Sequence, residues 1–177
     1  MSPSEAADTG GTVYRRRGAL SWLAHFPVLA GAGSGLVAAV GMGVVLQFGA
    51  DAMPLVGALY GQESVLVGWI AHLFNGVALG VVFAGLVTRT PLARIATSRE
   101  TVFGLGVGYG AVLGLVSGGL LFPIALRIAG VSTVATPFLP LPGLVSELVV
   151  AASLAVGHLV YGGVLGALVG LADVVEE

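Results

Sequence analysis

The sequence predicts an all-α fold: a polytopic transmembrane four-helix bundle built from two parallel two-span repeats. Three observations support this prediction: the composition, the spacing of the charges and an internal repetition. Hydrophobic residues make up 56% of the 177 residues and charged residues only 9%, against roughly 25% charged residues in an ordinary soluble domain. A water-soluble fold of this size could not cover its surface with so few charges, so much of the chain must be solvated by lipid.

Four apolar stretches, of which only the last contains a charged residue, Glu147 near its outer end, are each long enough to cross a membrane, which takes about 20 helical residues for ~30 Å of hydrocarbon. We predict spans over residues 27–48, 64–87, 102–124 and 144–171. Together they form one transmembrane domain, residues 18–177, preceded by a disordered cytoplasmic tail, residues 1–17. The arginines that end this tail and the apolar run after them resemble a secretory signal. That run is too long for a signal and belongs to a repeat, so we expect a retained span.

The arginines predict the orientation, because cytoplasmic loops carry an excess of positive charge. Six of the seven lie before the first span or between the second and third: Arg15, Arg16, Arg17, Arg89, Arg94 and Arg99. Only Arg127 lies in the other two loops. We therefore predict a multi-pass protein of the cytoplasmic membrane with both termini in the cytoplasm. A net charge of −2 gives no indication of a nucleic-acid partner.

Two blocks of sequence occur twice, in the same order. Residues 31–41 align with residues 104–114, with glycine at the first, third, fifth and eleventh positions of both. Residues 72–80 align with residues 158–166 and share His, Leu, Gly, Leu and Gly. Two-span repeats have the same orientation, so we expect a pseudo-twofold axis along the membrane normal. The second repeat carries extra residues in segment 123–143, where prolines predict a cap in the outer interface.

Small residues recur every fourth position on all four spans and predict close helix packing, because such stripes let backbones approach in lipid. The predicted packing glycines are Gly31, Gly35, Gly76, Gly80, Gly106, Gly110, Gly114, Gly118, Gly162 and Gly166. If the third-span stripe packs against the first span, the bundle is solid. Gly33, Gly41, Gly104 and Gly108 then remain for contact with another chain. We accordingly expect a homo-oligomer or a membrane-protein partner within the lipid bilayer.

His72 and His158 are the candidate functional residues, because both fall near the middle of a span and an ionisable residue there is a functional hypothesis. A pair of histidines on facing spans could ligate a b-type haem. They could also line a proton or ion path, or each could make one interhelical hydrogen bond, for example to Asn75 or Tyr161. The cofactor is therefore open. No catalytic dyad, phosphate-binding loop or cysteine occurs, so we expect neither an enzyme nor a metal site.

With its glycine-rich first span and the His-Leu-x-x-Gly blocks at His72 and His158, the chain resembles a group of small four-span haloarchaeal membrane proteins. Members are sometimes labelled histidine kinases, but this chain has no room for an ATP-binding domain. The group offers no established functional residues to carry over. The predicted function is a structural or accessory subunit of a membrane assembly. The alternatives are a haem-binding electron-transfer module and a small proton or ion conductor that works as an oligomer.

Overall fold

The computed structural model describes residues 26–131, 135, 137 and 141–172. All regular structure within these residues is helical, which confirms the predicted all-α class. The elements are α1 (Pro27–Ala50), α2 (Met53–Ala58), α3 (Val65–Arg89), a 3-10 helix (Pro91–Arg94), α4 (Arg99–Leu113), a π-helical segment (Gly114–Leu121), α5 (Phe122–Ile128) and α6 (Gly143–Leu171). The predicted tail, residues 1–17, lies outside the described residues.

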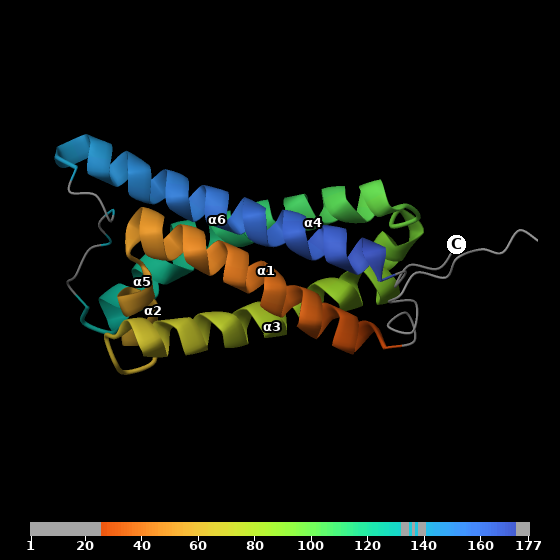
Figure 1. Ribbon diagram of the computed structural model, residues 1–177, viewed down its shortest axis with the longest axis horizontal. Coiled ribbons are helices and arrows are strands. Elements are labelled where there is room, and N and C mark those ends of the chain that lie inside the picture. The colour runs from red at the N-terminus through yellow and green to blue at the C-terminus, as the bar shows by residue number, and fades with distance from the viewer. Residues whose placement is uncertain (1–25, 132–134, 136, 138–140, 173–177) are drawn as a thin grey trace, which may run out of the picture.

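Four helices are long and apolar enough to cross a membrane, as in a multi-pass membrane protein: Pro27–Ala50, Val65–Arg89, Arg99–Ile128 and Gly143–Leu171. They run side by side along the long axis of the molecule (Figure 1). The third is longer than predicted, because the helix continues from α4 through the π-helical segment and α5. The segment predicted to form an outer cap, residues 123–143, therefore begins as a helix that continues the third span.

Local sequence explains where these helices begin and end. The Ser64 hydroxyl accepts a hydrogen bond from the Val67 N–H at 3.2 Å, and the Ser98 hydroxyl accepts one from the Thr101 N–H at 3.2 Å. Both serines are therefore N-caps that satisfy a free backbone donor of the first turn. α1 ends at Asp51, whose φ of 41° is left-handed, with its N–H donating back to the Gln47 carbonyl. A left-handed residue in this position stops the helix.

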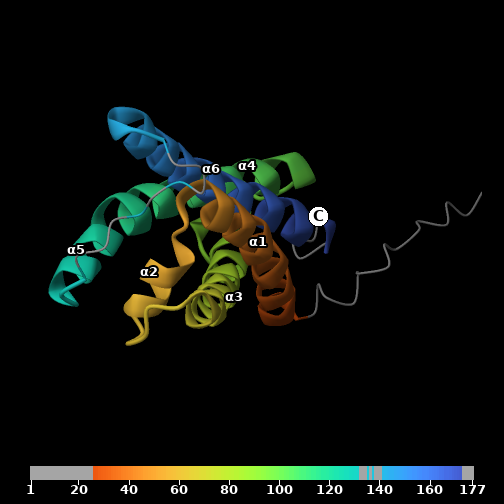
Figure 2. The same cartoon turned by 60° about the vertical axis from the view of Figure 1, so that its left-hand side comes forward.

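The four long helices form an arc that is open on one side. α1 packs along α3 and along α6, and α4 packs along α6, whereas α3 and α4 meet at only a few points. The spatial order is therefore α3, α1, α6, α4, and Figure 2 shows α5 turning away from the first turns of α6. The third span thus packs along the fourth and not along the first, so the condition under which we expected a solid bundle is not met. A strict pseudo-twofold axis is also absent from the described helices, because it would make the α3–α4 contact match the α1–α6 contact.

The α1–α6 contact depends on small residues. A Cβ built on Gly41 would lie 3.3 Å from the Val160 side chain, and one on Gly157 would lie 3.3 Å from the Leu46 side chain. The core is formed mainly by buried apolar residues of α1, α3 and α6, with Ala38, Ala39 and Leu165 fully covered. Gly41 thus lies inside the bundle, and it is not part of a free face as the sequence suggested.

Candidate functional site

In the first pair, α1 and α3, the backbones touch at glycines. A Cβ on Gly35 would lie 2.5 Å from the Gly76 carbonyl oxygen and 2.9 Å from the Gly80 Cα. A Cβ on Gly31 would lie 2.6 Å from the Gly80 carbonyl oxygen. No side chain other than hydrogen fits at these positions, and such close approach is how helices gain dispersion contacts in lipid.

In the second pair, α4 and α6, the contact is of the same kind. A Cβ on Gly106 would collide with the Gly162 carbonyl oxygen and lie 2.6 Å from the Gly166 Cα. A Cβ on Gly110 would collide with the His158 carbonyl oxygen and lie 2.9 Å from the Gly162 Cα. The third-span glycines therefore pack on the fourth span and not on the first.

The glycine contacts of the two helix pairs correspond to each other. The residues that correspond are, however, not those that the sequence alignment matches. Gly35 lies against two glycines of α3 as Gly106 lies against two glycines of α6. The alignment instead matches Gly35 with Gly108, where an added Cβ would have no neighbour within 4 Å. Because α4 carries glycine at positions 106 and 108, the sequence alone allows either of them to correspond to Gly35. The structure distinguishes them, because only Gly106 contacts the backbone of α6.

His72 is buried and its ring faces α1. Its Nε2 lies 3.0 Å from the Ala39 carbonyl oxygen, which can only accept, so Nε2 carries the proton and donates. The ring stands edge-on to Trp69, with centroids 6.2 Å apart and an interplanar angle of 89°. Gly43 leaves room for it, since a Cβ there would lie 3.2 Å from the imidazole Cδ2. His72 therefore joins α3 to the backbone of α1.

His158 is also buried, and its ring faces the π-helical segment that continues α4. Its Nδ1 lies 2.7 Å from the Leu154 carbonyl oxygen and must donate to it, while its Nε2 lies 3.1 Å from the Ser117 Oγ. Ser117, in the π-helical segment, also donates to the Leu113 carbonyl oxygen. A neutral imidazole leaves Nε2 as an acceptor, so the single hydroxyl proton of Ser117 is shared between this nitrogen and Leu113.

The expected partners of the two histidines have other roles. The Asn75 side-chain oxygen accepts a hydrogen bond from the Tyr60 hydroxyl at 2.9 Å. The buried Tyr161 hydroxyl donates to the Gly76 carbonyl oxygen at 2.7 Å and so ties α6 to α3. Neither Asn75 nor Tyr161 thus forms the predicted interhelical hydrogen bond with a histidine. The His72 ring instead bonds to α1, and the His158 ring bonds to the π-helical segment that continues α4.

This geometry does not fit a shared haem. Bis-histidine ligation needs one nitrogen of each ring on a single iron, with each ligand bond about 2 Å long. The two rings point to different helices, and the Nε2 atoms are engaged with Ala39 and Ser117. Gly114 and Gly118, which could have left space for a porphyrin, lie against the His158 ring itself. Among the described residues, no cluster of three or more His, Asp or Glu side chains could hold a metal ion.

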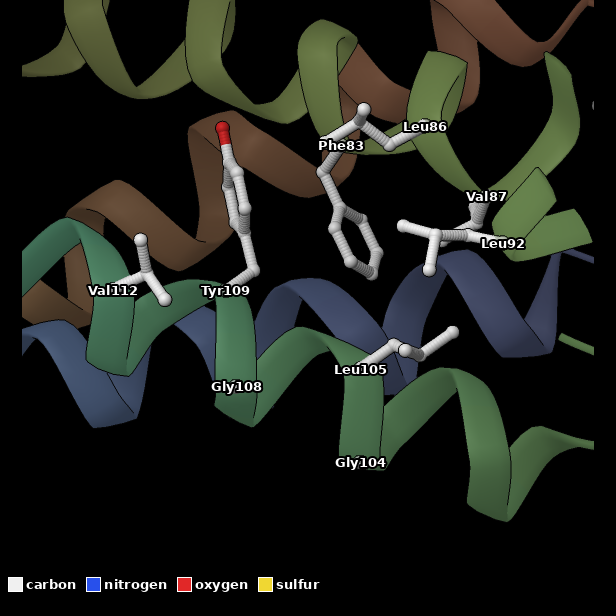
Figure 3. Close-up of a pocket in the computed structure, with 9 residues that line it drawn as sticks. All are labelled: Phe83, Leu86, Val87, Leu92, Gly104, Leu105, Gly108, Tyr109 and Val112. Carbon is white, nitrogen blue, oxygen red and sulfur yellow. The ribbon is translucent and has the colours of Figure 1, made fainter. Parts of the chain in front are cut away.

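A cavity of about 350 Å³ lies between α3 and α4 (Figure 3). Its lining is Phe83, Leu86, Val87, Leu92, Gly104, Leu105, Gly108, Tyr109 and Val112. The one hydroxyl in the lining, that of Tyr109, donates to the Leu79 carbonyl oxygen at 3.0 Å, so the groove presents apolar surface. The glycine pattern predicted that Gly104 and Gly108 lie on a free face, but it did not predict this groove between α3 and α4.

No protein-family model, curated protein or solved structure matches this chain. The chemistry of its own residues therefore has to carry the functional argument.

Proposed function

We propose that this protein is a structural or accessory subunit of a membrane assembly. The observation that carries the proposal is the way the two intramembrane histidines are used. Each ring is buried and bonded to a neighbouring helix, His72 to Ala39 of α1 and His158 to Ser117 of the π-helical segment, while the second nitrogen of His158 bonds to Leu154 of its own helix. Both side chains thus act as interhelical ties of the kind that polar residues form in membrane bundles.

The outer halves of the third and fourth spans support association with another protein. Leu115 is 75% exposed, Ile128 82%, Leu144 69% and Leu148 60%. No residue in the most apolar window of the third span is buried, whereas 44% of the corresponding window in the first span is. In the orientation that we propose from the arginines, with both termini cytoplasmic, this apolar surface lies in the outer half of the bilayer.

The alternatives receive less support from the contacts. Haem binding by His72 and His158 would require both side chains to give up their hydrogen bonds to Ala39 and Ser117. A conductor would need a polar path along the bundle, but the cavity between α3 and α4 is apolar and neither histidine lines it. Membership of the small four-span haloarchaeal group likewise stays a proposal, based on the blocks at His72 and His158.

The test is purification of the full chain from its native membrane in a mild detergent. An accessory subunit copurifies with a larger membrane complex in fixed proportion, and the preparation is colourless. Leu144→Ser together with Leu148→Ser should reduce this copurification, whereas Val37→Ser together with Val44→Ser on the exposed face of α1 should not. A Soret band that is lost in both His72→Ala and His158→Ala would overturn the proposal in favour of haem binding.

A further inference from the structure

We propose that the α3–α4 groove is a binding site for an anionic membrane lipid, with an acyl chain in the groove and the phosphate at the arginines beside it. This inference is independent of the accessory role. It starts from the sparse contact between α3 and α4, which leaves an apolar hollow between two membrane-spanning helices. Because these helices are immersed in lipid, hydrocarbon chains surround the groove at high concentration.

The walls of the groove suit a hydrocarbon chain. Phe83 and Tyr109 form one side, with ring centroids 5.3 Å apart, and Figure 3 shows both rings directed into the space between the two helices. Gly104 and Gly108 leave the α4 side open, since a Cβ on either would meet nothing within 4 Å. The Tyr109 hydroxyl is already engaged with Leu79. The lining therefore presents no polar side-chain group to which a polar ligand could bind.

The size of the groove fits a hydrocarbon chain. The cavity measures about 350 Å³, which is near the lower end of the range for small-ligand sites, about 300–1,000 Å³. A flexible chain can occupy such a space without separating the helices further.

Charge at one end of the groove identifies the headgroup. Leu92, which lines the groove, lies in the 3-10 helix Pro91–Arg94 that joins α3 to α4. Arg89 ends α3 and Arg94 ends the 3-10 helix, and both are exposed on either side of Leu92. No acidic residue lies between Arg89 and Arg94. Guanidinium groups bind phosphate with paired hydrogen bonds, so this end of the groove is complementary to an anionic headgroup.

The experiment is native mass spectrometry of the full chain in detergent, titrated with phosphatidylglycerol or with phosphatidylcholine. We expect phosphatidylglycerol to bind more tightly. Arg89→Gln with Arg94→Gln should weaken phosphatidylglycerol roughly fivefold for each arginine and weaken phosphatidylcholine less, because its choline cation offsets the charge of its phosphate. Gly108→Leu should weaken both lipids roughly tenfold, the effect of displacing about two methylene groups from an apolar site.

Two control variants match these changes. Gly33→Leu adds the same side chain at another open position, on α1, and Arg127→Gln removes an exposed arginine at the opposite end of the molecule (Figure 1). Neither should alter lipid binding. Equal binding of the two lipids to the unchanged protein would overturn the headgroup assignment. Unaltered lipid binding in Gly108→Leu would contradict the assignment of the groove as a lipid site. A Gly108→Leu protein that changed from dimer to monomer and kept its lipid would contradict it as well.

Discussion

Because the backbones of α4 and α6 are in contact, we predict that adding one methyl group at Gly106 destabilises the protein. In Gly106→Ala the new Cβ would collide with the Gly162 carbonyl oxygen and lie 2.6 Å from the Gly166 Cα and 2.8 Å from its nitrogen, where ordinary contact begins at 3.4 Å. All three atoms belong to backbone and cannot rotate away. The helices must therefore separate by a large fraction of an ångström, and a gap of 0.5–1 Å forfeits about a quarter to a half of each dispersion contact.

The matched control is Gly104→Ala, one half-turn earlier on the same helix, where the Cβ meets nothing within 4 Å. Both variants gain the same helix propensity, roughly 1 kcal/mol for Gly to Ala. Overpacking costs about 1–3 kcal/mol, so we expect Gly106→Ala to be less stable than Gly104→Ala by about 1–3 kcal/mol.

The assay is unfolding of the purified protein in mixed micelles by increasing SDS, followed by near-ultraviolet circular dichroism. The midpoint for Gly106→Ala should fall at a clearly lower SDS fraction than that for Gly104→Ala. Equal midpoints would refute the reasoning, because they would mean that α4 and α6 do not approach through their glycines.

Tyr161→Phe should destabilise the protein by about 1–2 kcal/mol in the same titration, because it leaves the buried Gly76 carbonyl oxygen without its interhelical donor. Tyr60→Phe, which removes an exposed hydrogen bond, should cost less than about 0.5 kcal/mol. In a cysteine-free chain, Thr97→Cys and Gln62→Cys should be labelled from opposite sides of the membrane, with Thr97 cytoplasmic; labelling from one side would contradict the four-span topology.

The sequence predicted the spans well where charges bound them, and less well where a proline did. Glu63 and Arg89 lie just outside the second predicted span, and α3 fills the interval between them. The third span was predicted to end near Pro123, because proline lacks the N–H that continues a helix. In the structure the π-helical segment comes first, with the Phe122 N–H donating to the Ser117 carbonyl oxygen. Pro123 then lies in the first turn of α5, where no donor is needed.

The choice of helix partners could not be predicted from the stripes, because all four spans carry similar ones. Side-chain size at other positions explains the outcome. α1 and α6 meet at Gly41, Gly49 and Gly157. In the register of the observed glycine contacts, the corresponding positions across α3 and α4 hold Val112, Leu120 and Ala71. Side chains of this size would not let α3 and α4 approach as closely as α1 and α6 do.

The two kinds of helix contact give the molecule an uneven stiffness. Within each pair, backbone lies on backbone, so no side chain can rearrange to accommodate sliding. Between the pairs, α1 and α6 also meet through flexible side chains such as Met42 and Leu46, which can change rotamer as packed helices shear. The seam between α1 and α6 is therefore the natural hinge. A small rotation about it would widen or narrow the space on the far side, between α3 and α4, in response to lateral pressure in the bilayer.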